Sequence, residues 1–208
     1  MISFLVVDDH PIVRKVICQI LDDYAVDTQI VEAGDASEAM KKFREHKYDL
    51  ILLDINLPGR GGLDLLEDIK GYEPEVRVLM VSMYPEQQYA IRALRTGAAG
   101  YLTKESAADE LIVAIDKILK GGRYITQSIA EQIFDAIDKQ GPPHESLSNR
   151  ELEVLIQIAK GRSLKEIGEM LALSEKTIST YRSRILEKMS MSSNADLVRY
   201  ALQNKMID

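Results

Sequence analysis

The sequence predicts an α/β domain, built on a doubly wound five-stranded parallel sheet, followed by a smaller all-α domain. Five short apolar runs alternate with amphipathic stretches before residue 122, which is the pattern of a parallel sheet covered by helices. A Gly-Pro-Pro sequence at 141–143 then ends the pattern, and beyond it apolar residues recur at helical spacing. The 208 residues are sufficient for two such domains.

The strands are expected at the apolar runs, because strands buried on both faces of a sheet read as nearly continuous apolar sequence. These runs are Phe4–Val7, Gln29–Val31, Leu50–Leu53, Val78–Val81 and Ala99–Leu102. The first helix begins at Pro11, a residue that suits a first helical turn. Further helices are expected over Asp35–His46, Leu63–Lys70, Glu86–Thr96, Ala107–Lys120 and Gln127–Lys139.

Composition places the chain among ordered, soluble proteins. It is 46% hydrophobic and 28% charged, which is too apolar for a disordered protein. Met1–Val7 is short and lacks a basic leader, so it is expected to be a strand rather than a signal peptide, and no apolar run approaches membrane-spanning length. We therefore expect a cytoplasmic protein. Cys18 is the only cysteine and is expected to be a buried structural thiol.

Charge is distributed unevenly between the two halves. Residues 146–208 carry ten Lys/Arg and eight Asp/Glu, a net charge of +2, whereas the remainder carries 16 and 25, a net charge of −9. The low overall pI of 5.1 is therefore due to the first part of the chain, and it does not exclude nucleic-acid binding by the second.

Polar residues close several of the predicted strands. The carboxyl ends of adjacent parallel strands line one crevice, so these residues are expected to meet there. Three carboxylates about 4 Å apart repel one another by about 4 kcal/mol per pair, and a divalent cation with a lysine would offset this repulsion. The set predicts a metal and phosphoryl site and consists of Asp8, Asp9, Asp54, Ser82 and Lys104.

The order of these residues resembles the receiver domain of bacterial two-component response regulators. The resemblance covers residues 1–122 and includes Asp54-Ile55-Asn56-Leu57-Pro58 and Tyr101-Leu102-Thr103-Lys104. It implies a flavodoxin-like fold, a phosphoacceptor at Asp54, and a sensor histidine kinase as phosphoryl donor. It also implies Mg²⁺ held by Asp8, Asp9, Asp54 and the Asn56 carbonyl, with Ser82 and Lys104 contacting the phosphoryl group and Tyr101 as an aromatic switch.

Simpler interpretations of single residues remain open at this point. Ser82 could cap the following helix, and Tyr101 could be core packing. His10 is expected to be a helix-entry residue, and without cysteine partners it does not indicate a zinc site. A metal-dependent aspartyl-phosphate phosphatase would require an acid/base aspartate two residues after its nucleophile, where this chain has Asn56, so we do not expect an enzyme.

After the linker, capping signals indicate a helix-turn-helix arrangement. Ser148 and Ser163 each begin a capping box, which predicts helices over 149–160 and 164–171. Ser174 begins a third helix that ends near Met189 and has an apolar inner stripe and a polar, basic outer face. A fourth amphipathic helix is expected over 194–203.

The amino-acid sequence of this region resembles the DNA-binding domain shared by LuxR-type and NarL/FixJ-type regulators. The similarity spans residues 146–208 and includes Leu147–Leu155, Ala159–Ser163 and Leu173–Ile178. It implies contacts with double-stranded DNA from Lys176, Ser179, Thr180, Arg182, Ser183, Arg184 and Lys188. Ser179 and Ser183 replace lysines that many members carry, so no base preference follows.

The two resemblances together predict a transcriptional response regulator of the NarL/FixJ family. Its expected domains are a receiver at 1–122, a helical linker at 123–145 and a DNA-binding domain at 146–208. The resemblance further implies a homodimer on phosphorylation or DNA binding, through the helix at 194–203, and RNA polymerase as a partner. The apolar face of this fourth helix could equally well pack beneath the third helix, which would be the recognition helix. A regulator or interaction protein that works without phosphorylation stays a second possibility.

Overall fold

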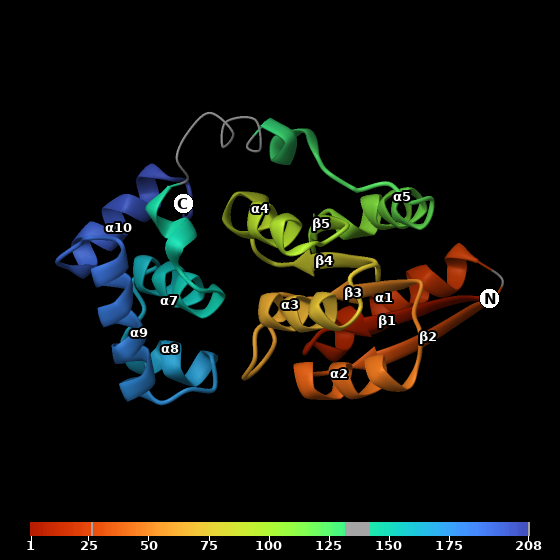
Figure 1. Cartoon of the computed structure of the whole chain (residues 1–208), viewed down its shortest axis with the longest axis horizontal. Helices are drawn as coiled ribbons and strands as arrows, with labels where there is room; N and C mark the ends of the chain where they lie inside the picture. The colour runs from red at the N-terminus through yellow and green to blue at the C-terminus, as the bar shows by residue number, and fades with distance from the viewer. Residues whose placement is uncertain (26, 132–141, 208) are drawn as a thin grey trace. The chain divides into compact units, whose positions relative to one another are not determined.

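The computed structural model describes residues 1–25, 27–131 and 142–207 (Figure 1). The chain divides into two compact units, Met1–Gln132 and Ile133–Asp208. The first combines strands with helices and the second is helical, which confirms the predicted fold class. Among the helices of the described residues, none is long and apolar enough to span a membrane.

The sheet of the first unit is parallel throughout. Its strands are β1 (Ile2–Val7), β2 (Thr28–Ala33), β3 (Leu50–Leu53), β4 (Val78–Ser82) and β5 (Gly100–Thr103). They lie in the order β2-β1-β3-β4-β5, with β1 between β2 and β3. All the predicted strands are confirmed, but β1 and β2 extend further because they pair from Ile2 and Thr28 onward. The order reverses beside β1, and folds of this type bind ligands at that point.

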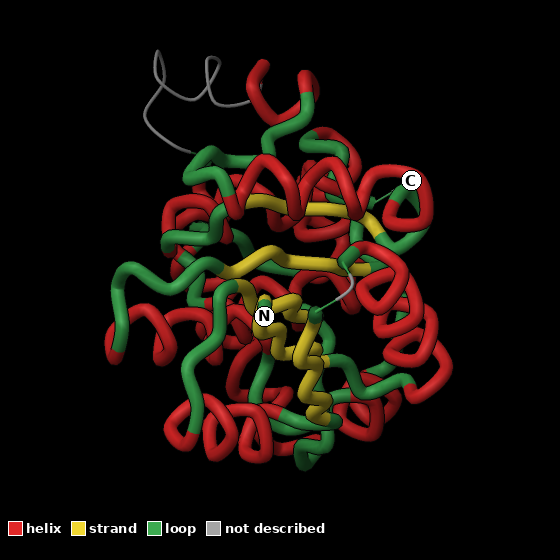
Figure 2. Tube along the Cα trace, turned by 90° about the vertical axis from the view of Figure 1, so that its right-hand side faces the viewer, coloured by secondary structure: helices red, strands yellow, loops and turns green. Residues whose placement is uncertain are grey.

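Helices connect the strands and cover the sheet on both faces (Figure 2). They are α1 (Pro11–Tyr24), α2 (Ala36–Glu45), α3 (Gly62–Tyr72), α4 (Glu86–Thr96) and α5 (Ala107–Leu119), which confirms the predictions. The further helix expected over 127–139 is present at 127–131. Its remainder lies within residues 132–141, which are the central part of the predicted linker and are outside the described residues.

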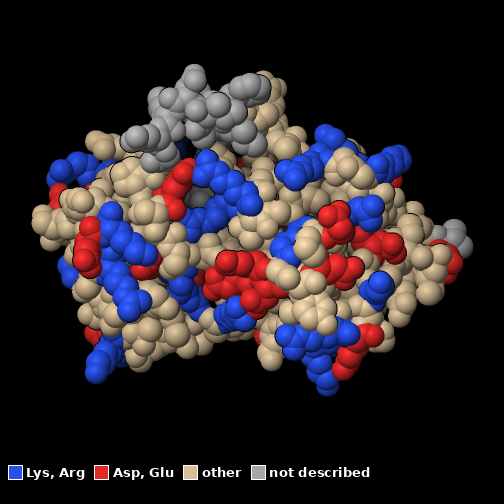
Figure 3. All heavy atoms as spheres, in the orientation of Figure 1, with Lys and Arg blue, Asp and Glu red and all other residues tan. Residues whose placement is uncertain are grey.

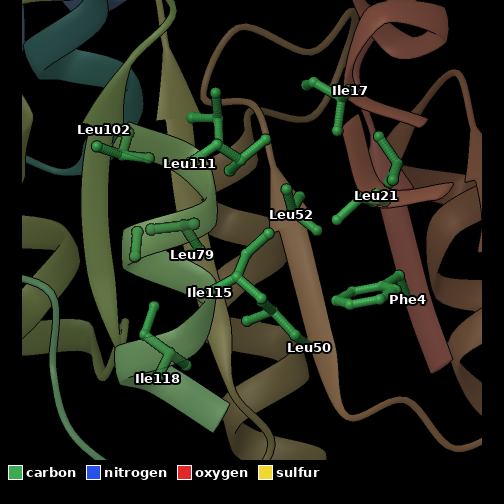
Figure 4. Packing of buried hydrophobic residues seen from close by; sticks show 13 residues of the cluster. Phe4, Ile17, Leu21, Leu50, Leu52, Leu79, Leu102, Leu111, Ile115 and Ile118 are labelled. Atoms are coloured by element: carbon green, nitrogen blue, oxygen red, sulfur yellow. The ribbon is translucent and has the colours of Figure 1, made fainter. Parts of the chain in front are cut away.

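One large hydrophobic cluster fills the space between the sheet and helices α1 and α5 (Figure 4). Alternate residues of the central strands point into it, because side chains alternate between the faces of a strand. Its labelled members in Figure 4 are Phe4, Ile17, Leu21, Leu50, Leu52, Leu79, Leu102, Leu111, Ile115 and Ile118. Cys18 packs beside this cluster and is half-buried, not fully buried as predicted. Burial raises the pKa of its thiol to about 11, which keeps the thiol unreactive.

The second unit consists of short helices with well-defined starts. After a 3-10 turn (η1, Pro143–Ser146) come α7 (Asn149–Ala159), α8 (Leu164–Met170), α9 (Glu175–Lys188) and α10 (Asn194–Gln203). Capping boxes at Ser148 and Ser163 are confirmed, Ser174 accepts a hydrogen bond from Thr177 N, and Ser193 adds a further capping box. Helix α9 packs against both α7 and α8.

Glycine 62 allows helix α3 to approach the end of β3 very closely. A Cβ atom at Gly62 would stand 1.9 Å from the Asp54 carbonyl oxygen, and Gly62 N donates a hydrogen bond of 2.8 Å to Ile55 O. The close contact fixes the loop that carries Asp54. A side chain at this position must therefore displace either the helix or the loop.

We predict that Gly62→Ala lowers the free energy of unfolding by about 1–3 kcal/mol, the usual cost of overpacking. Gly71→Ala is the matched control on the same helix, because a Cβ there meets no atom within 4 Å. We expect that control to gain about 0.5 kcal/mol from the better helix propensity of alanine. Urea unfolding of both variants tests this, and equal stabilities would contradict the close contact.

Candidate functional site

Three charged side chains from three strand ends meet at the carboxyl edge of the sheet. Asp8 follows β1, Asp54 follows β3, and Lys104 follows β5. Lys104 Nζ lies 2.6 Å from Asp8 Oδ2 and 2.7 Å from Asp54 Oδ2. Both aspartates are buried, with 1% and 2% of their surface exposed. The structure thus brings together residues that lie far apart in the sequence, as the topology predicted.

The backbone holds these side chains in place. Asp54 N donates to Val7 O at 2.9 Å, and Lys104 N donates to Ser82 O at 2.7 Å. Both bonds continue the sheet ladders one residue past the strands. The side chains therefore project from positions that are nearly as fixed as the strands themselves.

Asp9 and His10 complete the acidic edge. His10 Nδ1 lies 2.5 Å from Asp9 Oδ1, and ligand atoms of Asp8, Asp9, His10 and Asp54 all lie within 4.8 Å of one another. His10 precedes α1, as expected for a helix-entry residue. Its approach to the acidic cluster was not predicted, although its place directly after the aspartate pair was an available signal. Asn56 N donates to Asp54 Oδ1 at 3.2 Å.

The electrostatics of the cluster favour an added cation. Burial raises the pKa of Asp54, and the opposing effect of Lys104 does not cancel this rise. Burial lowers the pKa of Lys104, but Asp54 and Asp8 outweigh burial and raise it overall. With Asp9, the cluster holds three carboxylates against one ammonium group. The excess negative charge and the oxygen-rich donor set fit a hard divalent ion.

Ser82 and Tyr101 lie together on the neighbouring strands. Ser82 is buried, and its Oγ accepts a hydrogen bond from Tyr84 N at 3.2 Å rather than capping α4, which begins after Pro85. Tyr101 is also buried, donates to Tyr84 O at 2.8 Å and interacts with the Ser82 hydroxyl. Burial raises the pKa of this phenol. The tyrosine therefore lies in an inward position beside Ser82.

In the second unit, helix α9 is two-sided, as predicted. Ile178 and Ile185 are buried, and Met189 is buried just past the helix end. The opposite side is exposed and carries most of the predicted DNA contacts, with Arg182 half-buried. The exposed members are Lys176, Ser179, Thr180, Ser183, Arg184 and Lys188.

Two of the predicted DNA-contacting cations have partners within the unit. Lys188 Nζ lies 2.6 Å from Glu151 Oε2, and Arg182 Nε donates to Asn194 Oδ1 at 2.6 Å. Burial raises the pKa of Glu151, but Lys188 and Ser148 outweigh burial and lower it overall. Neither partner was predicted. Glu151 was recognised only as part of a capping box, and nothing in the sequence linked it to a lysine 37 positions later.

Charged side chains of both signs occur over both units on the face drawn in Figure 3. The visible face is therefore not a uniform basic surface.

Two family models match the chain. The response regulator receiver domain matches residues 4–116, and the luxR family of bacterial regulatory proteins matches residues 145–201. The response regulator GacA of Pseudomonas aeruginosa is 37% identical over an aligned length of 214 residues. The alignment covers 100% of this chain and 99% of GacA.

Solved structures of response regulators also resemble this chain. A LuxR-family two-component response regulator from Aurantimonas is 35% identical with a TM-score of 0.60, covering 66% of this chain and 98% of that protein. RcsB from Salmonella enterica serovar Typhimurium, solved bound to a promoter with a phosphomimetic, is 25% identical with a TM-score of 0.61. That match covers 96% of this chain and 97% of RcsB.

The charge cluster predicts opposite stability changes for two substitutions. In metal-free buffer near neutral pH, Lys104→Met leaves two buried carboxylates without their cation and should cost about 3–5 kcal/mol. Asp54→Asn should instead stabilise the fold, because a carboxyl with a raised folded-state pKa opposes folding once it is ionised.

The stabilisation by Asp54→Asn should shrink as the pH falls toward the ordinary aspartate pKa of 3.8, where Asp54 becomes protonated in the unfolded chain too. Urea unfolding with a chelator, near neutral pH and at about pH 4, measures this dependence. Lys120→Met is the control, because Lys120 pairs with Asp116 at the surface and its removal should cost less than about 1 kcal/mol. Equal losses for Lys104→Met and Lys120→Met would be inconsistent with a buried charge cluster.

Proposed function

Because the chain belongs to the NarL/FixJ family of two-component response regulators, we propose that phosphorylation of Asp54 controls DNA binding by its LuxR-type domain. The observation that carries this proposal is the buried contact between Lys104 and both Asp8 and Asp54. It supports the proposal because Asp54 would be the nucleophile and Lys104 would neutralise charge, beside the Asp8 carboxylate, at the edge of the sheet where folds of this type bind ligands.

The proposed reaction makes use of this arrangement. A carboxylate oxygen of Asp54 attacks the phosphorus of a phosphohistidine on a sensor kinase, and the bond from phosphorus to the imidazole nitrogen breaks as the imidazole leaves. Lys104 is positioned to balance the charge of the product phosphoryl group. Asp8, Asp9, Asp54 and the Asn56 carbonyl would hold Mg²⁺. When bound, this ion would neutralise charge on the transferring phosphoryl group.

The response is proposed to pass through Ser82 and Tyr101. A phosphoryl oxygen on Asp54 is an additional acceptor for the Ser82 hydroxyl. Moving Ser82 toward that oxygen would change its contact with Tyr101 and its bond from Tyr84 N. The loop after β4 would then adopt a different state, which makes it a two-state element biased by phosphorylation.

In the second unit, α9 is proposed to enter the major groove of double-stranded DNA. Ser179, Thr180, Arg182 and Ser183 would lie nearest the bases, and Lys176, Arg184 and Lys188 nearer the phosphates. Binding as a homodimer through α10, a cytoplasmic location and contact with RNA polymerase remain proposals, as do the boundaries at residues 122 and 146. They are supported by the family to which the chain belongs.

We predict that Asp54→Asn abolishes Mg²⁺-dependent labelling by a small phosphodonor, because the amide is a poor nucleophile. Asp49→Asn is the matched control, since Asp49 stands just before β3, at the opposite end of the same strand. The control should label like the unmodified chain. Comparable labelling of Asp54→Asn would refute the assignment.

The time course separates the alternative functions. A stable adduct is expected for a receiver, whereas fast turnover would indicate a phosphatase. Absence of labelling in the unmodified chain would indicate a regulator or interaction protein that works without phosphorylation.

The phosphate contact of Lys176 is tested by salt dependence. We predict that Lys176→Ala weakens binding to all DNA sequences alike and reduces the slope of log affinity against log salt by about one. Lys205→Ala, the same change beyond the end of α10, should leave the slope unchanged. A loss confined to one DNA sequence would instead identify Lys176 as a base contact.

A further inference from the structure

A shallow, open hollow lies beside the exposed side of α9, the proposed recognition helix. It lies between the first residue of α8 and the first three turns of α9, and it is lined by Leu164, Glu175, Lys176, Ser179, Thr180 and Ser183. Ser179 and Ser183 contribute only short side chains to its lining, and a long side chain at either position would extend into it.

Two of the hydroxyl groups around the hollow are turned toward the helix backbone. Thr180 Oγ1 donates to Lys176 O at 3.0 Å, and Ser183 Oγ donates to Ser179 O at 3.1 Å. Each of these hydroxyl protons is therefore used within α9. At Thr180 the methyl group is left as the contact surface, and Leu164 adds a second apolar group.

The lining carries one charged side chain of each sign, Glu175 and Lys176, so it has no net charge that would favour a backbone phosphate. Base edges in the major groove also carry no net charge, and they fit a lining of this kind. Among them, thymine presents an apolar 5-methyl group, which is read by apolar contact with groups such as a threonine methyl.

We infer that this hollow receives the 5-methyl group of a thymine, with the Thr180 methyl and Leu164 as its apolar walls. The inference rests on the proposed DNA-binding function and adds a base preference to it. Thr180 and Leu164 are then specificity-determining residues, and Leu164 contributes from outside the recognition helix.

The test begins with the full-length chain, treated with a small phosphodonor, selecting its preferred half-site from random-sequence duplexes. Each thymine of that site is then replaced singly by deoxyuridine, which removes only the methyl group. At one thymine per half-site, we expect affinity to fall about fourfold, the equivalent of the ~0.8 kcal/mol for burying one methyl-sized group.

Variants assign the effect to the hollow. Thr180→Ser and Leu164→Ala should reduce or remove the difference between thymine and deoxyuridine at that position, whereas Thr180→Val, which keeps a methyl group, should retain it. Thr177→Ser is the matched control, because it makes the same chemical change on α9 at a residue that does not line the hollow.

The results that would overturn the inference are equally specific. The hollow does not read a thymine methyl if deoxyuridine is tolerated at every position, or if Thr180→Ser and Leu164→Ala keep the full difference. Failure to select or bind any duplex would overturn the DNA-binding function itself, and the inference with it. The two failures are distinguishable, because one removes the effect of a single methyl group and the other removes all affinity.

Discussion

The receiver site depends on the contact between the ammonium group of Lys104 and the carboxylates of Asp8 and Asp54. The ammonium group reaches from the end of β5 to the carboxylates after β1 and β3, and so it joins strand ends that are not adjacent to β5 in the sheet. This contact requires the carboxyl ends of the strands to lie level with one another. The parallel pairing of the strands and the close approach of Gly62 to Asp54 both serve that alignment.

The charge cluster of Asp8, Asp54 and Lys104 contributes little to the stability of the fold. A buried group of charges usually stabilises a fold less than apolar residues of the same volume, since desolvation offsets the attraction. The raised pKa of Asp54 shows that desolvation remains the larger effect there. Because burial disfavours the ionised form of Asp54, a nearby cation would lower the free energy of the folded state. Chemical conversion of the carboxylate to another group would also remove this cost. The apolar cluster between the sheet and helices α1 and α5, rather than the charge cluster, supplies the stability of this unit.

Much of this arrangement could be predicted from the sequence because topology alone decides where strand ends meet. Asp8, Asp54 and Lys104 were expected together for that reason, and the helix starts followed from local capping signals at Ser148 and Ser163. Contacts that depend on the angle between packed helices could not be predicted. The pair of Glu151 and Lys188 joins α7 to α9, and no local pattern specifies how two helices cross. The extra length of β1 and β2 likewise depends on pairing with a partner strand.

The contact between Lys188 and Glu151 has a consequence for the thermodynamics of DNA binding. Cations that approach a duplex displace condensed counterions, and this release makes affinity depend on salt. Lys188 already faces a carboxylate, so meeting a phosphate would exchange one anionic partner for another and leave Glu151 exposed as a negative charge near the DNA. Its net entropic contribution would be smaller than that of a solvated lysine. Counting the basic residues of α9 would therefore overestimate the number of ions released.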